Sequence, residues 1–555
     1  MPENLLTINN LHVHFPTEAG TVEAVRGISF SLKKGETLGI VGESGSGKSV
    51  TALSILGLLP APGIVAGGEI HFAPKDGEPV DLAKLPERQF QKIRGGEIAM
   101  IFQEPMTSLN PVFRCGEQVA EAIRLHHSVG NEEAKRQVLA LFEKAKLPEP
   151  ERIYRAYPHQ LSGGQIQRVM IAMALSGNPS LLIADEHTSA LDVSVQAAIL
   201  GLLNELKTGW GGSTIFISHN LAVVAQVASR VLVMKAGEIV EQGRVGEVFN
   251  KPQHLYTREL VLNSGLSSVH SPQFAVSSPQ SAVRSLAGGG RVMLMRELKT
   301  WFPAAKNFFG KAKSYVKAVD GVTLEILPGE TLGLAGESGS GKTTLGRSLL
   351  FLQKPTSGEV FYGEQNLARL TDGKWKALRK DLQIIFQDPY SSLNPRLPIG
   401  LALTEPMRVH GILSNEKERR QRAVELLETV GLEAGHFWRY PNEFSGGQRQ
   451  RICIARALAL EPRFIVCDEC VSALDVTVQA QVLNLLMKLK NERGLTYLFI
   501  SHDLAVVRAV SDRIAVMKDG KIVELGATEE VYTHPKCAYT KQLLDAIPKG
   551  TMREF

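Results

Sequence analysis

One set of short motifs occurs twice along this chain, in the same order. The pairs are GESGSGKS (42–49) and GESGSGKT (336–343), LSGGQ (161–165) and FSGGQ (444–448), LLIADE (181–186) and FIVCDE (464–469), and ISHN (217–220) and ISHD (500–503). The final glutamates of the third pair, Glu186 and Glu469, are 283 positions apart, and so are the histidines of the fourth pair, His219 and His502. A constant offset of this length indicates that a whole domain has been duplicated.

The repeat divides the 555 residues into two domains and a linker. We predict the first domain over residues 1–262, the linker over 263–291 and the second domain over 292–555. The linker is rich in Ser, Gly and Pro and has few large apolar residues, which is typical of a flexible tether. Such a tether keeps the two domains at a high effective concentration.

Each domain alternates apolar, β-rich runs such as TLGIVG with helical patterns such as QIQRVMIAMAL. This alternation predicts an α/β fold with a mainly parallel sheet and helices on both faces. The stretch from Gln103 to Leu161 differs, because it is rich in charge, compatible with helix and without a clear strand. We predict that it forms a helical subdomain inserted into the α/β core, with its counterpart from Gln387 to Phe444.

Composition and charge exclude some classes of function. The formal net charge of +5 is small for this length and argues against a strong nucleic-acid footprint. The polar start, MPENLLTINN, has no signal-peptide pattern, and the most apolar stretch, 50–67, contains Pro60 and Pro62. We therefore expect no membrane span. Of the five cysteines, only Cys467 and Cys470 approach a metal-ligand spacing, so we predict reduced thiols.

The pattern Gly-x-x-x-x-Gly-Lys-Ser/Thr predicts a phosphate-binding loop in each domain. Its glycines let backbone N–H groups turn inward, and the helix that follows presents its N-terminus to the anion. Lys48 and Lys342 are expected to reach the β- and γ-phosphates. The loop positions predicted to bind the nucleotide are Gly42, Ser44, Gly45, Gly47, Lys48, Ser49 and Val50, and Gly336, Ser338, Gly339, Gly341, Lys342, Thr343 and Thr344.

Two acidic residues follow one another at the end of an apolar strand in each domain. Asp185 and Asp468 are placed to reach Mg²⁺ together with the hydroxyl groups of Ser49 and Thr343. Glu186 and Glu469 come one residue later and suit a general base that orients water. The sequence therefore predicts hydrolysis of a nucleoside triphosphate with ATP and Mg²⁺ as ligands.

Together these motifs resemble the nucleotide-binding domains of ATP-binding-cassette (ABC) proteins, over nearly the whole chain outside the linker. The resemblance implies two P-loop domains with RecA-like α/β cores that dock head to tail and form two composite sites. In one site Lys48 faces Ser445, Gly447 and Gln448, and in the other Lys342 faces Ser162, Gly164 and Gln165. The other implied positions are Gln103 and Gln387 for nucleotide and Mg²⁺, Asp192 and Asp475, His219 and His502 at the γ-phosphate, and Phe15 and Phe302 (with Trp301 as its rival) for adenine.

A narrower resemblance comes from EPMTSLNP (104–111), DPYSSLNP (388–395), HLYT (254–257) and CAYT (537–540). In combination they are similar to the oligopeptide/dipeptide/nickel branch of importer ATPases in its fused form, which includes glutathione and microcin-type peptide importers. This implies a peripheral subunit on the cytoplasmic face of a bacterial inner membrane. Its partners would be two membrane permease subunits and a periplasmic or extracellular solute-binding protein, with no nucleic acid. Neither end has the four cysteines that an iron–sulfur cluster needs, so we expect none.

The chain departs from the family pattern without losing a ligand. His187 and Cys470 stand where a proline usually follows the catalytic glutamate, and Phe444 replaces the usual Leu. Because no phosphate, metal or water ligand is removed, we expect both sites to hydrolyse ATP. Cys470 is either a packed, inert thiol or one that makes its site sensitive to thiol reagents.

Other ABC classes remain open at this point. A soluble translation-type ABC factor also has two cassettes, but it typically has a long, charged helical linker. A tandem sugar-importer ATPase often has one degenerate site, and DNA-repair cassettes form a further alternative. The Ser/Gly/Pro tether and the two intact motif sets favour the peptide-importer branch.

Overall fold

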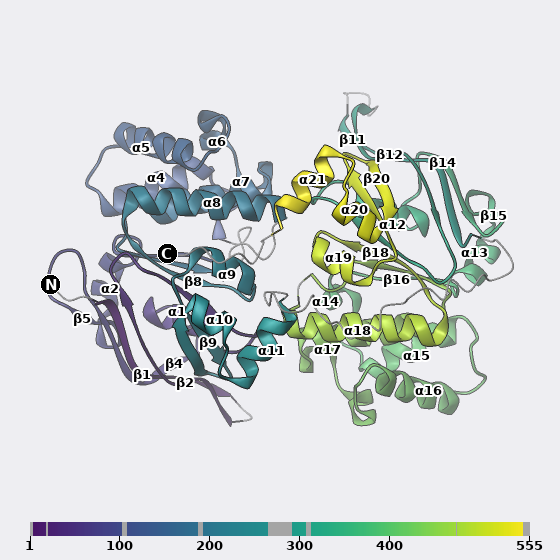
Figure 1. The fold of residues 1–555 in the computed structure, drawn as a ribbon, viewed down its shortest axis with the longest axis horizontal. Coiled ribbons are helices and arrows are strands. Elements are labelled where there is room, and N and C mark those ends of the chain that lie inside the picture. Colours follow the sequence, from purple (N-terminus) through teal and green to yellow (C-terminus); the bar gives the residue numbers. More distant parts are fainter. Residues whose placement is uncertain are drawn as a thin grey trace.

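The computed structural model describes residues 4–17, 20–102, 108–186, 193–264, 291–306, 312–472 and 474–547. Residues 4–264 and 291–547 form two halves with the same order of elements (Figure 1). Each half contains a six-stranded sheet, a four-stranded sheet and a group of helices set to one side. The predicted α/β fold with an inserted helical subdomain is confirmed.

A mainly parallel six-stranded sheet forms the centre of each half. In the first half its order is β10 (Glu238–Arg244), β9 (Arg230–Lys235), β3 (Thr37–Val41), β8 (Ser213–Ile217), β7 (Leu181–Asp185) and β6 (Ile98–Ile101). In the second it is β20 (Lys521–Ala527), β19 (Arg513–Lys518), β13 (Thr331–Ala335), β18 (Thr496–Ser501), β17 (Phe464–Asp468) and β16 (Leu382–Ile385). All neighbouring pairs are parallel except β10–β9 and β20–β19. The strands β3 and β7 are buried along their whole length, as expected of parallel strands covered on both faces.

An antiparallel four-stranded sheet, which the sequence patterns did not reveal, lies beside each parallel sheet. Its strands are β2 (Gly20–Lys33), β1 (Asn4–Thr17), β4 (Ile64–Phe72) and β5 (Val80–Asp81), and β12 (Ala312–Ile326), β11 (Met293–Lys306), β14 (Ser357–Tyr362) and β15 (Gln365–Asn366). Ile8 pairs with Phe30 on one side and with Ile70 on the other. These residues share one core with Ile55, so the helix α1 (Lys48–Ile55) is buried between the two sheets.

The helical subdomains occupy the predicted segments and extend by one further helix each beyond the predicted ends at Leu161 and Phe444. They consist of α4 (Cys115–His126), α5 (Asn131–Lys144), α6 (Pro150–Arg155) and α7 (Gly163–Leu175), and of α14 (Pro389–Ser392), α15 (Ile399–Val409), α16 (Glu416–Thr429) and α17 (Gly446–Leu458). The first of them packs around Val119, Val138 and Phe142, in a core that also includes Ile101 and Leu182 of the parallel sheet.

The remaining helices complete the two halves. They are α2 (Glu87–Ile93), α8 (Val193–Trp210), α9 (Leu221–Val227), α10 (Val245–Asn250) and α11 (Leu255–Asn263), and α12 (Lys342–Leu349), α13 (Asp372–Leu378), α18 (Val476–Arg493), α19 (Leu504–Val510), α20 (Thr528–Thr533) and α21 (Ala538–Asp545).

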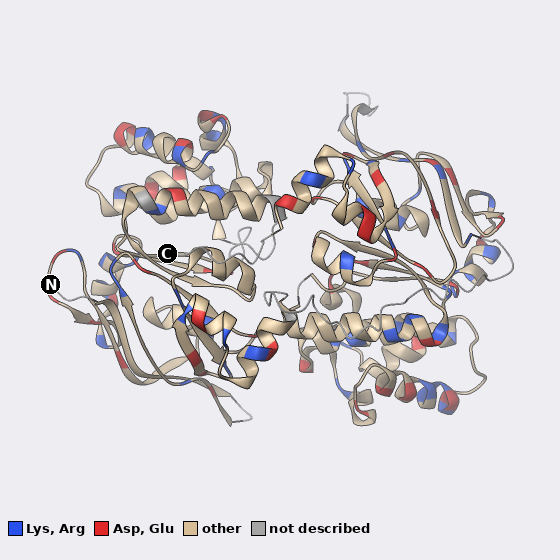
Figure 2. Ribbon diagram, viewed as in Figure 1, with Lys and Arg blue, Asp and Glu red and all other residues tan. Residues whose placement is uncertain are grey.

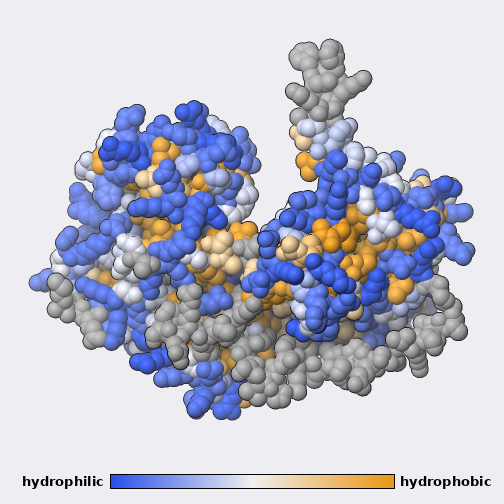
Figure 3. Space-filling model, turned by 45° about the horizontal axis from the view of Figure 1, so that its top comes forward, coloured by the Kyte–Doolittle hydropathy of each residue, from blue (hydrophilic) through white to orange (hydrophobic). Residues whose placement is uncertain are grey.

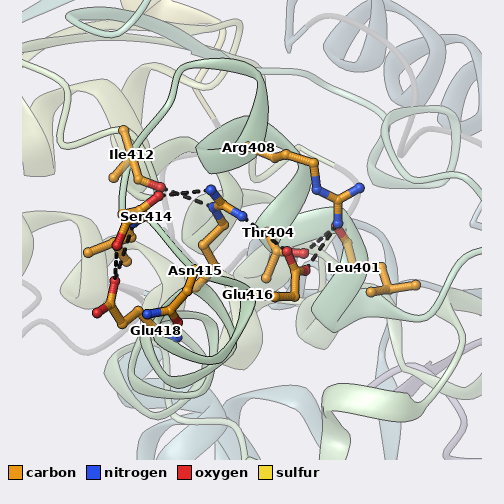
Figure 4. A network of polar contacts seen from close by, with 10 residues as sticks. Leu401, Thr404, Arg408, Ile412, Ser414, Asn415, Glu416 and Glu418 are labelled. Carbon is orange, nitrogen blue, oxygen red and sulfur yellow. Dashed lines mark hydrogen bonds and ion pairs between the residues drawn. The ribbon is translucent and has the colours of Figure 1, made fainter.

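The turn between α15 and α16 is fixed by a polar network (Figure 4). The guanidinium of Arg419 donates to the carbonyl oxygens of Ile412 (3.2 Å) and Leu413 (2.8 Å) and to Glu416 (3.1 Å). Arg408 donates to the other carboxylate oxygen of Glu416 at 3.1 Å. Arg408, Glu416 and Arg419 thus connect the two helices to each other and to the carbonyl groups of the turn. The angle between α15 and α16 is therefore constrained by hydrogen bonds as well as by apolar packing.

The two halves contact each other through helices at their inner ends. The helix α11 of the first half contacts α18 of the second, and α21 of the second contacts α8 of the first. In Figure 1 the helical subdomain of each half lies on the same side as the sheet of the other half. The halves are therefore arranged head to tail.

Charges of both signs are interspersed along the outer helices α5 and α16 in Figure 2. The face shown in Figure 3 is largely hydrophilic, with hydrophobic surface between the halves and on the second half. Among the described residues, no helix has the length and apolar character needed to cross a membrane.

A close contact inside the second helical subdomain gives a test of this packing. A Cβ placed on Gly400 would lie 2.4 Å from the ring of Phe437. We expect Gly400→Ala to lower the free energy of unfolding by about 1–3 kcal/mol through overpacking, measured by thermal and denaturant unfolding. Gly373→Ala is the control, because a Cβ on Gly373 in α13 meets no atom within 4 Å. Equal effects of the two substitutions would contradict the packing argument.

Candidate functional site

Each phosphate loop connects a central strand, β3 or β13, to the N-terminus of α1 or α12. Gly47 precedes α1 with φ of 98°, and Gly341 precedes α12 with φ of 107°. A Cβ at Gly341 would lie 1.9 Å from the carbonyl oxygen of Ala318, and one at Gly47 would lie 2.6 Å from that of Ala24. Glycine is therefore required here by both backbone conformation and space.

A buried lysine lies inside each loop. Lys48 and Lys342 are only 5% and 4% exposed. The Lys48 ammonium donates to the carbonyl oxygens of Gly42 (2.9 Å) and Glu43 (2.8 Å), and Lys342 makes the same pair of bonds at 2.8 and 2.9 Å. Burial lowers the pKa of Lys48, and the nearby carboxylates counteract only part of this effect. A cation held at a helix N-terminus is suited to bind phosphate.

A hydroxyl and a carboxylate come together beside each lysine. Ser49 donates to Asp185 at 3.1 Å, and Thr343 donates to Asp468 at 2.8 Å. Burial raises the pKa of Asp185 to about 6 and also raises that of Asp468. The second carboxylate oxygen of Asp468 is buried without a hydrogen-bond partner in the described part of the chain. Hard oxygen donors with one unsatisfied oxygen fit Mg²⁺.

The neighbouring glutamates face a different set of groups. Glu186 and Glu469 have φ of 40° and 46°, which is uncommon for a side chain of this kind. Glu186 lies 3.5 Å from Nδ1 of His219 and 3.8 Å from Nζ of Lys48. Glu469 lies 3.3 Å from His502 and 4.0 Å from Lys342. In both halves the histidine is therefore brought to the glutamate and the serine or threonine to the aspartate.

The pKa of each glutamate is set by opposing effects. Burial acts to raise the pKa of Glu186, but its hydrogen bond with His219 and the charges of His219 and Lys48 lower it overall. The same balance lowers the pKa of Glu469, with His502 and Lys342 as partners. Both glutamates are therefore ionised at neutral pH and able to accept a hydrogen bond from water.

The SGGQ motifs open the helices α7 and α17. Ser445 accepts from the backbone N–H of Gln448 at 3.3 Å, and the Gln448 side chain accepts from the backbone N–H of Ser445 at 3.0 Å. Ser162 and Gln165 form the same reciprocal cap. These capping boxes fix the two exposed helix ends that the sequence resemblance assigned to the opposite site.

One electrostatic interaction joins the halves at the first site. Asp475 of the second half caps α18, and its charge acts against the lowering of the pKa of Lys48 in the first half. In the second site, Gln387 donates to Glu469 at 2.9 Å. Their counterparts Asp192 and Gln103, and also His187, lie outside the described residues.

The aromatic candidates lie on the antiparallel sheets. Phe15 is partly buried and packs against the first core, whereas Phe302 is 36% exposed. Trp301 has the ammonium of Lys317 at 4.7 Å from its ring. Their roles in binding adenine stay predictions.

Sequence reasoning missed two residues that touch the phosphate loops. The backbone N–H of Glu43 donates to the phenol oxygen of Tyr256 at 3.0 Å, and that of Glu337 donates to Tyr539 at 3.3 Å. Both tyrosines belong to the HLYT and CAYT segments, which had served only as family markers. The two tyrosines occupy the same position in the two segments, and this was the signal from which the sequence could have identified them.

The Cys470 side chain is 2% exposed. This burial favours a packed thiol over a reactive one, because reactive cysteines are partly exposed and buried structural cysteines are inert.

Comparisons with known proteins bear on these sites. The family described as ABC transporter matches residues 25–189 and 319–472, which together are more than half of the chain. The chain belongs to the ABC transporter family. The family described as oligopeptide/dipeptide transporter, C-terminal region, matches residues 523–553 of this ABC protein. The chain is thus an ABC ATPase with two ATP-binding cassettes of the oligopeptide/dipeptide branch.

Two similar proteins are the glutathione import ATP-binding proteins GsiA of Escherichia coli (strain K12) and Shigella sonnei (strain Ss046). Each is 48% identical to this ABC ATPase, over 98% of this chain and 90% of the relative. A solved ATP-binding cassette, dimeric in a post-hydrolysis state with ADP and Pi, is 32% identical over 42% of this chain and 98% of its own, with a TM-score of 0.39.

The hydroxyl–carboxylate pair can be tested directly in the ABC ATPase. We expect Thr343→Ala to raise the Mg²⁺ concentration needed for half-maximal ATP hydrolysis by about tenfold, because a hydrogen bond to a charged group is lost. Thr343→Ser keeps the hydroxyl and serves as the matched control. A Mg²⁺ titration in which both variants shift equally would show that the hydroxyl is not the group that matters.

Proposed function

We propose that this ABC ATPase is the subunit that hydrolyses ATP to energise a bacterial importer of peptides or peptide-like solutes. The observation that carries the proposal is the 48% identity to glutathione import ATP-binding proteins over 98% of the chain. The match of residues 523–553 to the oligopeptide/dipeptide transporter C-terminal region supports the same branch. We keep 1–262, 263–291 and 292–555 as the proposed boundaries of the first cassette, the linker and the second cassette.

The proposed chemistry follows from the groups around each loop. Lys48 and Lys342 bind the β- and γ-phosphates, because each ammonium group is already buried and is held near the N-terminus of a helix. Ser49 with Asp185, and Thr343 with Asp468, would hold Mg²⁺, which supplies charge neutralisation to the phosphate oxygens. These roles are our proposal for the whole set of predicted site residues.

Water is activated by the second acidic residue of each pair. An ionised Glu186 or Glu469 accepts a hydrogen bond from the attacking water and orients it. His219 and His502 lie against these carboxylates and are placed to contact the γ-phosphate from the same side. The lysine lies 3.8–4.0 Å from the glutamate, so the group proposed to bind phosphate and the group proposed to orient water are neighbours.

Each site is proposed to be completed by the opposite cassette. The head-to-tail arrangement and the action of Asp475 on Lys48 support this reading. Ser445, Gly447 and Gln448 would cover the nucleotide on Lys48, and Ser162, Gly164 and Gln165 the one on Lys342. Binding of ATP then favours closed cassettes, and hydrolysis favours open ones. The difference in ATP affinity between the closed and the open arrangement sets how much free energy is transmitted.

The partners that receive this motion are proposed to be two membrane permease subunits, supplied with solute by a periplasmic or extracellular binding protein. The ATPase would then be a peripheral protein on the cytoplasmic face of the inner membrane. Selection of the solute would rest with the binding protein and the permeases, because the described groups of the two sites are suited to nucleotide and metal.

Replacement of the glutamates tests both sites. Glu186→Gln and Glu469→Gln keep the shape of the side chain but cannot accept a proton, so we expect each to reduce ATP hydrolysis by about 10²-fold or more and to retain bound ATP. Hydrolysis and nucleotide retention after gel filtration measure this. Glu364→Gln, in an exposed turn, is the control. A variant with an unchanged rate would show that its site is not catalytic.

Uptake tests the transport function. In cells lacking the gene, we expect loss of uptake of labelled glutathione or of labelled di- and tripeptides, restored by the wild-type chain and not by the Glu186→Gln, Glu469→Gln double variant. Normal uptake of all these probes in the deletion strain, with loss of sugar uptake instead, would overturn the proposal. Ribosome-bound protein with unchanged uptake would place the chain in the translation-factor class.

A further inference from the structure

The phenol oxygens of Tyr256 and Tyr539 contact the same atom in the two cassettes. Each accepts a hydrogen bond from the backbone N–H of the second residue of its own phosphate loop, Glu43 at 3.0 Å and Glu337 at 3.3 Å. The two tyrosines are only 3% and 7% exposed. Tyr256 and Glu43 are 213 positions apart, so this is a tertiary contact made twice by the fold.

Both tyrosines are held rigidly. Glu241 accepts from the backbone N–H groups of Gln253 (2.9 Å) and His254 (3.0 Å), and this fixes the start of α11. In the second cassette Glu524 makes the equivalent bonds at the start of α21, at 2.7 and 3.1 Å. The ammonium groups of Lys235 and Lys518 lie 4.6 and 4.5 Å from the centres of the two rings. A phenol fixed in this way can position the group that it binds.

The peptide unit that Tyr256 binds is the one that the loop lysine also uses. Lys48 donates to the carbonyl oxygen of Gly42, while Tyr256 accepts from the N–H of Glu43, and these two groups belong to the same peptide unit. The turn between β9 and β10 adds a bond from the N–H of Gly237 to the carbonyl oxygen of Ser46, at 3.1 Å. The loop is thus held at its start by a side chain from α11 and further along by a backbone turn.

The helices that carry the tyrosines also reach the opposite cassette. The helix α11 contacts α18, which begins directly after Asp475, and α21 contacts α8. The charge of Asp475 acts to raise the pKa of both Tyr256 and Lys48. The opposite cassette is therefore in contact with the helix that carries the tyrosine bound to the phosphate loop, so a shift of that cassette acts on this helix.

We propose that Tyr256 and Tyr539 are positioning residues that fix the phosphate loops for ATP and couple each loop to the docking of the opposite cassette. The phenol keeps the Glu43 or Glu337 peptide oriented so that the loop amides converge on phosphate. Movement of α18 or α8 against α11 or α21 shifts the phenol, and with it the geometry of the loop. This role concerns ATP binding and does not depend on which solute is transported.

Removal of one hydroxyl tests the positioning role. In the full chain with Lys342→Ala, so that only the Lys48 site binds tightly, we expect Tyr256→Phe to raise the Kd for a fluorescent ATP analogue about three- to tenfold, the effect of one lost hydrogen bond. With both sites intact, the KM for ATP should rise while kcat changes less than twofold. The mirror variant, Tyr539→Phe with Lys48→Ala, provides a second, independent measurement if the first protein folds poorly.

Tyr154→Phe is the matched control. It removes an equally buried phenol hydroxyl, which donates to Glu117 at 3.0 Å in the helical subdomain of the same cassette. We expect it to lower the thermal midpoint and to leave the Kd for nucleotide unchanged. An unchanged Kd in both Tyr256→Phe and Tyr539→Phe would overturn the positioning role.

A double-mutant cycle tests the coupling. Tyr256→Phe and Asp475→Ala are combined in the Lys342→Ala chain, and binding of the same ATP analogue is measured. If docking acts on the loop through Tyr256, the second substitution has less effect on Kd once the first is present. Additive effects would overturn the coupling and leave only local positioning.

Discussion

The organisation of each cassette depends on keeping an ammonium group out of water. Lys48 and Lys342 are almost completely buried, and an isolated buried charge is strongly unfavourable unless polar groups surround it. The loop meets this requirement by turning two carbonyl oxygens toward each lysine, and Glu186 or Glu469 completes the set at about ion-pair distance. Glycines at the helix start are required because the strand and the neighbouring backbone leave no room for a Cβ. The site is therefore largely preformed before any phosphate arrives.

This arrangement also directs the two consecutive acidic residues toward different groups. Asp185 and Asp468 lie at the ends of straight strands and stay beside the hydroxyl of the loop. The following residue adopts positive φ, and its carboxylate faces the lysine and the histidine instead. Burial raises the pKa values of both aspartates, and the charge of the adjacent glutamate acts in the same direction.

Local patterns in the sequence were sufficient for the parallel sheet, the helical subdomains and the strand-end acids. Apolar runs such as β3 and β7 are buried along their full length, so their pattern is unambiguous. The antiparallel sheet was not foreseen, and part of it joins residues far apart along the chain, such as Ile8 with Ile70, which no local pattern specifies. The link between Tyr256 and Glu43 escaped for the same reason, since nothing near either residue specifies the other. The packed state of Cys470 depends equally on tertiary contacts.

The head-to-tail pair of cassettes lies on one polypeptide. In a symmetric homodimer every substitution appears at both sites at once, and any change must suit both. Fusion removes that constraint. This chain already has Ser49 opposite Thr343, Ala184 opposite Cys467 and His187 opposite Cys470 at matching positions. Gene fusion thus allows the two ATP sites to evolve as separate parts, while translation of a single chain guarantees that one of each is always present.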